Sequence, residues 1–314
     1  MKKIFCAVLA IAAMASCSNE YTIDTQKQAI AFGEAFVNNG TRADYSDGTN
    51  KVEEFLVYGT VKGKYADNAP VVYIFDGATV KRPTGLANYA PATAWTCTET
   101  QYWVPNTNYA FTAVVDGELS ADHSEIGFTV ADGEDNLDLL YATATASVNN
   151  DGTPEILNPE NTAGYVAFEF DHLLSKLQFN QPTHNMAGCD VVVTGIKVSG
   201  VVDNGVYAIN SGTWAAAEGA DDDVELTFSP VTGGFETRQI LPLEQTLTVT
   251  ISYDVKIGTD KISEVVKTGT IPAQTYAKGY VYAITPKITA NKIEFTVEDV
   301  NGWETGAGIT TPIQ

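Results

Sequence analysis

The chain has 314 residues, of which 44% are apolar and 18% are charged, and its excess of acids over bases gives a formal net charge of −21. This composition excludes a disordered protein, and the excess of acids disfavours nucleic acid and anionic membrane surfaces, which bind through Lys and Arg. The length fits one large or two medium-sized domains. We therefore expect an acidic, soluble and extracellular globular protein.

The first 16 residues have the proportions of a secretory signal peptide. Two lysines precede an apolar run at residues 4–15, which is too short to span a bilayer as a mature helix. The run ends in small residues before Cys17, and this pattern resembles the lipobox of bacterial lipoproteins. We predict that residues 1–16 are removed and that Cys17 carries lipid, the alternative being an ordinary signal with an incidental cysteine. Several acyl chains, at about 0.8 kcal/mol per buried methylene, would anchor the protein stably.

Two cysteines remain when Cys6 leaves with the signal and Cys17 is acylated, namely Cys97 and Cys189. A secreted protein can form disulfides, but these two residues lie far apart in the sequence and are expected in different domains. We expect two buried thiols, which pack as small apolar side chains.

The body of the chain is predicted to consist of β-strands. Residues 245–257 alternate strictly between apolar and polar side chains, which is typical of a strand with one buried and one exposed face. Long helical periodicity is absent, and the best short helical candidate is residues 172–177. Further strands are predicted at residues 55–61, 71–75, 109–115, 139–147, 165–170, 191–198, 224–228 and 293–297.

Turn signals separate these strands. Asn204-Gly205 lies between two pairs of apolar residues and predicts a two-residue hairpin, because both turn positions favour a positive φ. The polar stretch at 149–164 contains two prolines and predicts a domain boundary. Many short strands with this punctuation indicate an all-β protein built from sandwiches.

The sequence indicates no enzyme. Its three histidines, His123, His172 and His184, are scattered, and no nucleophile, zinc, phosphate-loop or dinucleotide motif occurs. His172 precedes an apolar run and is predicted to pack or form hydrogen bonds rather than catalyse. Two acidic clusters, at 132–138 and 221–225, lack the ligand spacing of a calcium loop and are predicted to be solvated. We expect no metal, no cofactor and no catalytic residue.

The arginines are more informative, because there are only three. Arg82 precedes a proline, which makes a poor bond for trypsin-like proteases, and Arg238 lies in a predicted strand at 235–241. Arg42 lies in a small, polar stretch at 38–44, of the kind that proteases cleave. From these residues alone, a cleavage site and a plain linker between anchor and body are equally good interpretations.

Cys17 and five short stretches, taken together and in order, resemble the fimbrillins, which are the subunits of type V pili of anaerobic gut and oral bacteria. The resemblance covers nearly the whole chain. It is carried by Cys17, Ala29-Ile30-Ala31-Phe32, Thr41-Arg42-Ala43, Leu137 to Ala142, Phe168 to Leu177, and Ile293 to Val297 followed by Trp303.

This resemblance implies an all-β fold of two tandem transthyretin-like β-sandwich domains, at 43–155 and at 156–314. It also implies export as an outer membrane lipoprotein that is lipidated on Cys17. An arginine-specific protease would then cut the Arg42-Ala43 bond and remove a leader, residues 17–42, whose strand includes Ile30 and Phe32. The mature chain would join a cell-surface fimbrium of like or related subunits that supports cell adhesion, as a stalk or adaptor subunit.

We expect such subunits to assemble by strand exchange. A sandwich that loses an edge strand exposes unpaired backbone groups and an apolar groove, which a strand from another copy can fill. Ile293, Phe295 and Val297 alternate with polar residues and suit such a donor strand. Because donor and groove are different surfaces, the contact is head-to-tail and propagates as a filament.

Two other classes of function stay open at this point. A surface glycan-binding lipoprotein would also be acidic and all-β, and Trp95, Tyr102, Trp103 or Trp214 could stack on sugars. Arg42 separates these hypotheses, since a glycan binder needs no cleavable leader. A hydrolase rests only on the abundance of acids, from which nothing selects a pair.

Overall fold

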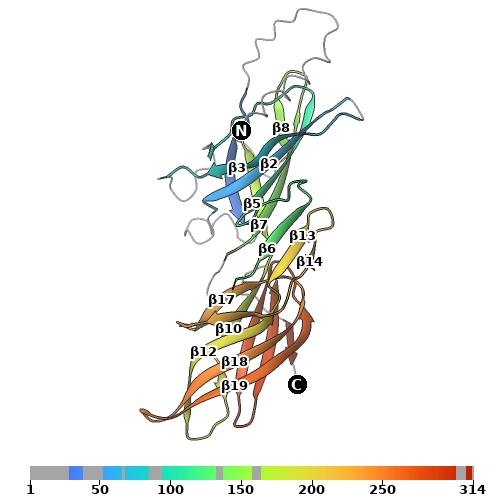
Figure 1. Ribbon diagram of the computed structural model, residues 1–314. Helices are drawn as coiled ribbons and strands as arrows, with labels where there is room; N and C mark the ends of the chain where they lie inside the picture. The colour runs from blue at the N-terminus through green and yellow to red at the C-terminus, as the bar shows by residue number, and fades with distance from the viewer. Residues whose placement is uncertain are drawn as a thin grey trace, which may run out of the picture. The chain divides into compact units, whose positions relative to one another are not determined.

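The computed structural model describes residues 28–37, 52–65, 68–84, 94–131, 137–157, 164–301 and 309–312. Within these ranges every regular element is a β-strand, so the all-β prediction is confirmed (Figure 1). No helix in this part of the chain has the length and apolarity needed to cross a membrane. The strands are β1 (Phe32–Val37), β2 (Glu54–Gly63), β3 (Val72–Lys81), β4 (Thr96–Cys97), β5 (Thr107–Val115), β6 (Glu125–Thr129), β7 (Leu140–Val148), β8 (Pro154–Leu157), β9 (Val166–His172), β10 (Ser175–Asn180), β11 (Thr183–His184), β12 (Asp190–Val201), β13 (Asn204–Ala208), β14 (Thr213–Ala216), β15 (Val224–Phe228), β16 (Pro230–Val231), β17 (Gly234–Ile240), β18 (Glu244–Ile257), β19 (Asp260–Thr275), β20 (Tyr280–Ile288), β21 (Ile293–Asn301) and β22 (Ile309–Pro312).

The described residues divide into two compact units that alternate along the chain. Unit 1 takes the residues up to Phe36, those from 52 to 113 and those from 142 to 169. Unit 2 takes those from 114 to 141 and those from 170 onward. The limits of two tandem folding domains, at 43–155 and 156–314, stay a prediction.

Unit 1 contains one sheet with the strand order β1-β9-β7-β5-β2-β3-β4, and β8 pairs with β7. Strand β7 illustrates how the sequence produces such a strand, since every second residue from Ala142 to Val148 is buried. Aromatic rings fill the core inside this sheet, where each is at most 2% exposed: Phe32, Phe55, Phe75, Phe111 and Phe168.

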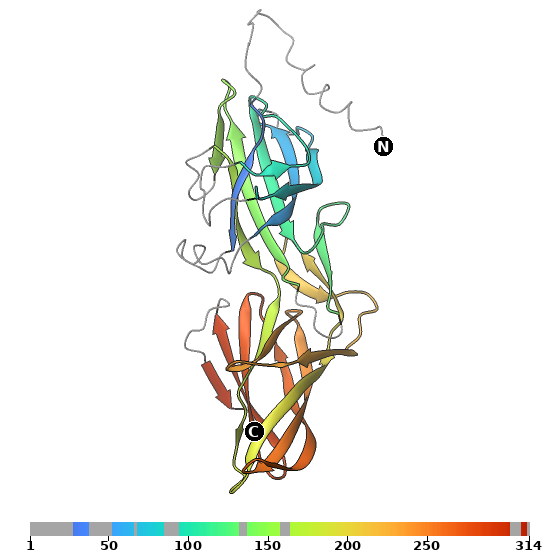
Figure 2. The same cartoon turned by 90° about the vertical axis from the view of Figure 1, so that its left-hand side faces the viewer.

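Unit 2 is a sandwich of two sheets, ordered β16-β17-β10-β20-β21-β22 and β15-β12-β18-β19. The rings of Phe179 on β10 and Phe228 on β15 meet edge to face between the sheets, with centroids 4.9 Å apart. Strands β18 and β19 form the long hairpin of this unit (Figure 1). Figure 2 shows the red C-terminal strands at one side of unit 2. A small third sheet has the order β14-β13-β6, and β11 pairs with β20.

Each segment predicted as a strand overlaps one in the structure, and the clearest of them, 245–257, lies within β18. Three residues on its core-facing side, Leu247, Val249 and Ile251, are fully buried. Strand β3 ends at Lys81 rather than at Phe75. It continues because Gly77, with φ of 78°, forms an irregularity beside β2 instead of a chain reversal.

The hairpin predicted at Asn204-Gly205 is wrong. Both residues lie inside β13, which pairs with β6 and β14 rather than with the preceding strand β12. Gly205 has no positive φ, and its role is close packing: an added Cβ would lie 2.9 Å from the Leu241 side chain. The chain passes from one sheet to another here, and the backbone N–H of Val202 donates to the buried Gln245 side chain.

The short helix considered at 172–177 is also wrong, because the segment joins β9 to β10. Leu173 and Leu174 are fully buried at this step, so burial outweighs the weak helical pattern. His172 pairs in register with Leu140, and its Nδ1 lies 2.9 Å from Oδ2 of Asp138. The histidine therefore forms a structural ion pair or hydrogen bond in unit 2.

Burial beside this pair lowers the pKa of Lys176 from 10.5 to about 8, although the negative charge of Asp138 opposes the shift. Between pH 8 and 10.5 the folded chain thus binds fewer protons at Lys176 than the unfolded chain does. The free energy of unfolding therefore rises with pH across that window, because the cost of burying the charged lysine is lost. We expect Lys176→Met to be more stable than the wild type at pH 7 by about 1–3 kcal/mol, with most of the difference lost at pH 10.

Urea unfolding at both pH values measures this difference, and Lys197→Met provides the control because that side chain is more than half exposed. A Lys176→Met variant that is no more stable at pH 7, or whose advantage is the same at pH 10, would contradict the expected role of burial.

The two remaining cysteines are free thiols in the structure. Cys97 lies on β4 and Cys189 immediately precedes β12, and each is partly buried. Burial raises the pKa of the Cys97 thiol, which keeps it protonated and unreactive at neutral pH.

Candidate functional site

Strand β1 and the residues before it lie between two backbone edges of unit 1. On one side the N–H of Val166 on β9 donates to the carbonyl of Ala31, at 2.8 Å. On the other side the N–H of Ile30 donates to Gln101, and Trp95 donates to Phe32, both at 2.8 Å. Further along this side, Ala29 and Tyr102 form an antiparallel bridge.

These contacts close the sheet of unit 1 on itself. Strand β9 stands next to β1 in the sheet order, and the segment 95–103 contains β4, at the opposite end of the same order. Sequence patterns missed this second edge, because 95–103 is mostly irregular and its partner lies far away in the chain. No local signal could have identified it.

The side chains of this segment are embedded as well. Ile30 is 5% exposed, and Phe32 is fully buried in the aromatic core. The Phe32 ring meets Phe75 and Phe111 edge to face, with centroids 5.3 and 5.8 Å away, and stacks on Phe168 at 6.2 Å. Such aromatic pairs contribute about 0.5–1.5 kcal/mol each beyond their burial.

Losing β1 would therefore open a groove with two polar edges and an aromatic floor. Val166 and Trp95 would have unpaired N–H groups and Gln101 an unpaired carbonyl, each a potential partner for another strand. Such a groove can bind an extended peptide through main-chain hydrogen bonds and side-chain pockets. We call this feature, lined by β9, residues 95–103 and the rings around Phe32, the leader groove.

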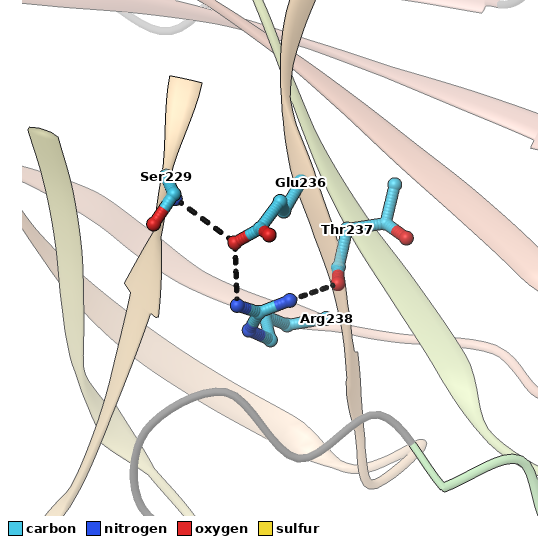
Figure 3. Close-up of polar contacts among 4 residues, drawn as sticks. All are labelled: Ser229, Glu236, Thr237 and Arg238. Atoms are coloured by element: carbon cyan, nitrogen blue, oxygen red, sulfur yellow. Dashed lines mark hydrogen bonds and ion pairs between the residues drawn. The ribbon is translucent and has the colours of Figure 1, made fainter. Parts of the chain in front are cut away.

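Two of the three arginines are protected from proteolysis by the fold. Arg238 lies on β17 and is 3% exposed, so the strand predicted there is confirmed. Its guanidinium donates to Glu236, at 2.8 Å, and to the carbonyl of Thr237, while the N–H of Ser229 donates to the same Glu236 carboxylate (Figure 3). These donors, together with the arginine charge, lower the pKa of Glu236.

Arg82 has a side chain only 12% exposed, and it pairs with Glu53 at 3.3 Å. Arg238 lies inside a paired strand, and Arg82 is held in an ion pair next to Pro83, which makes a poor bond for trypsin-like proteases. We therefore expect neither to be the first site of cleavage. Cys17, Arg42 and Ala43, the predicted lipidation and cleavage residues, lie outside the described residues.

The expected donor residues lie on β21 of unit 2. Ile293, Phe295 and Val297 are 8%, 4% and 5% exposed and share one face of the strand. The Phe295 ring lies against Gly269 on β19, where an added Cβ would come within 2.7 Å of it. Strand β21 is paired along its whole length with β20, and its other side pairs with the shorter β22.

The aromatic residues considered for a glycan platform have structural roles. Trp103 is 5% exposed and packs edge to face on Tyr109. The Trp214 indole donates to the Leu173 carbonyl at 2.8 Å, and Trp95 packs against Phe55. Tyr102 is 46% exposed but belongs to the wall of the leader groove. Among the described residues no cluster of His, Cys, Asp or Glu could hold a metal ion.

A sequence profile described as fimbrillin-like matches residues 41–303. The chain belongs to this fimbrillin-like family. A search of curated proteins found no match.

Solved structures show the same fold at low sequence identity. A fimbrial protein from Bacteroides vulgatus is 15% identical, with a TM-score of 0.50, and the match covers 88% of this chain and 100% of that one. A candidate cell adhesion protein from Bacteroides ovatus is 16% identical, with a TM-score of 0.54 and coverage of 90% and 99%. A similar protein from Bacteroides uniformis is 16% identical, with a TM-score of 0.52 and coverage of 87% and 97%.

Membership of the fimbrillin-like family identifies this chain as a fimbrial or adhesion type of protein with a cell-surface role. Association with other pilus subunits follows from the same family. The fimbrillin resemblance of the sequence and the all-β expectation are thereby confirmed.

Proposed function

We propose that this fimbrillin-like chain is a structural pilus subunit that is exported as a lipoprotein, cleaved after Arg42 and polymerised by strand exchange, and that the resulting fimbrium supports cell adhesion. The observation that carries this proposal is the position of β1, which is bonded on both sides and buried in unit 1. Strand β1 ends at Val37, only a few residues before Arg42, so the cut separates this strand from the rest of the chain.

Cleavage changes the competition for the leader groove. In the uncut chain the leader competes as part of the same molecule, with the high effective concentration of an intramolecular ligand. After the cut, only non-covalent contacts retain it, and a strand from a second copy can replace it. Assembly therefore waits until the protease has acted.

The donor is a C-terminal strand of another copy, with Ile293, Phe295 and Val297 on the inserted face. Because the groove lies in unit 1 and the donor in unit 2, each copy offers one groove and one donor. The contact is heterologous, and its repetition gives a head-to-tail filament.

Before cleavage, lipid on Cys17 holds the precursor at the outer membrane. The partners are this membrane, an arginine-specific maturation protease, and other copies or related pilus subunits. Removal of residues 17–42 releases the subunit from its anchor and makes it competent to enter a fimbrium at the cell surface.

Treatment of the purified full chain with an arginine-specific protease tests this proposal. We expect one major cut, after Arg42, because Arg82 and Arg238 are protected, and we expect fibres by electron microscopy after the cut. Mass spectrometry of the products locates the cut. A chain that is cut at Arg42 and stays monomeric would contradict polymerisation, and a first cut elsewhere would contradict the maturation site.

A further inference from the structure

The leader and the expected donor share a short sequence pattern at their buried positions. The leader contains Ile30-Ala31-Phe32, and β21 begins with Ile293-Glu294-Phe295. In both segments the Ile and the Phe are buried, at 5% and 0% exposure in the leader and at 8% and 4% in β21. The two strands therefore carry the same pair of buried side chains with the same spacing.

The floor of the leader groove favours an aromatic side chain at the second of these positions. Phe32 is fully buried among three rings, and a smaller side chain there would leave a cavity. Strand β22, with the sequence Ile-Thr-Thr-Pro, carries no aromatic residue, and its proline has no N–H. Strand β21 supplies a phenylalanine at the required spacing and contains no proline.

If β21 is the donor, the fit of its side chains in the leader groove has to determine whether the exchange is favourable. In the precursor the leader lies beside β9 and β21 lies beside β20. Once the leader has left, a β21 strand can either stay beside its own β20 or enter the leader groove of another copy. Hydrogen bonds are available in either place, since β20 and the leader groove both offer backbone edges. The preference for the groove then depends on how well Ile293 and Phe295 replace the leader side chains.

Building on the proposed strand exchange, we infer that the donor binds in one defined register, in which Ile293 takes the place of Ile30 and Phe295 takes the place of Phe32. The donor runs in the same direction as the leader, antiparallel to the segment 95–103. Ile293 and Phe295 are the specificity-determining residues of the exchange.

This register places an exposed donor residue opposite an exposed groove residue. Lys292 takes the place of Ala29, which forms the antiparallel bridge with Tyr102. Opposed residues of antiparallel strands have Cα atoms about 4.5–5.5 Å apart, which is within the range that a disulfide spans. Lys292 and Tyr102 are both exposed, so cysteines at these positions disturb neither core.

Disulfide trapping between two different variants tests the register. One chain carries Lys292→Cys and the other Tyr102→Cys, both with Cys97 and Cys189 replaced by Ser. The remaining cysteines, Cys6 and Cys17, lie before Arg42 and are removed with the signal and the leader. The mixed chains are cleaved after Arg42, oxidised, and analysed on a non-reducing gel. We expect a covalent dimer from this pair and none when Ala290→Cys or Glu294→Cys, each two residues away, replaces Lys292→Cys.

The outcomes distinguish this inference from the proposal on which it rests. Fibres that form without the 292–102 crosslink, or that crosslink through 290 or 294 instead, would overturn the register and leave strand exchange standing. Cleaved chains that form no fibres at all would contradict the proposed function, and the register with it.

A peptide of residues 290–301 tests the two specificity residues without disturbing unit 2. We expect it to bind the cleaved subunit and to compete with fibre growth. Replacing Phe295 by Ala in the peptide should weaken binding at least ~100-fold, because it leaves the aromatic floor unfilled. The matched control, Glu294→Ala, should bind within about 3-fold of the wild-type peptide, and equal binding of the Phe295→Ala peptide would overturn the assignment.

Discussion

Replacing Arg42 by Ala is expected to abolish fibre formation while leaving the fold intact. The structure holds β1 between β9 and residues 95–103, so an uncut chain keeps its leader groove filled by its own strand. The substitution leaves the sequence of β1 and of both walls of the leader groove unchanged, so the thermal midpoint of the variant should match that of the wild type. Electron microscopy after protease treatment should show monomers only.

Arg42→Lys is the matched control for this loss. It keeps a positive charge at the position, resists an arginine-specific protease and accepts trypsin. Lys51, the one lysine between β1 and β2, is replaced by Gln in both variants so that trypsin has no second site there. We then expect brief trypsin treatment to restore fibres in the Arg42→Lys chain and not in the Arg42→Ala chain. Fibres from the uncut Arg42→Ala chain would refute the gating role of cleavage, whatever the mature filament looks like.

The strands that could be predicted from the sequence are those in which apolar and polar residues alternate along the strand itself. In β18, alternation over Leu247, Val249 and Ile251 describes a strand with one buried face, and the structure agrees. The hairpin predicted at Asn204-Gly205 was wrong because these two residues suit a turn and close packing equally well. Only the contact with Leu241, which is distant in sequence, distinguishes the two. The short helix considered at 172–177 was wrong for a related reason, since the pairing of His172 with Leu140 outweighs the local helical spacing.

The candidate site divides in the same way. The sequence identified Ile30 and Phe32 as residues of a strand through their resemblance to a family, and alternation suggested the apolar face of β21. The sequence did not predict that residues 95–103 form a wall of the leader groove. Hydrogen bonds between an irregular segment and a distant strand produce no periodic pattern of apolar residues. The aromatic floor was equally hidden, since three phenylalanines from three strands converge there.

Replacing Phe32 by Ala is expected to destabilise the uncut chain by about 3–5 kcal/mol, through the lost burial and the cavity left among the three rings. Denaturant unfolding of the precursor measures this loss, and Phe32→Leu, which keeps most of the volume, should cost roughly 1–2 kcal/mol. Fibres assembled after cleavage should be as stable as wild-type fibres, because Phe32 leaves with the leader.

This contrast separates a removable strand from an ordinary core strand. If Phe32 remained in the mature subunit, its replacement would weaken precursor and fibre alike. If the leader is displaced, a weaker leader should instead leave faster after the cut, so that Phe32→Ala shortens the delay before fibres grow. Fibres that share the full instability of the Phe32→Ala precursor would therefore show that the strand stays in place, and the filament would then need a different joint.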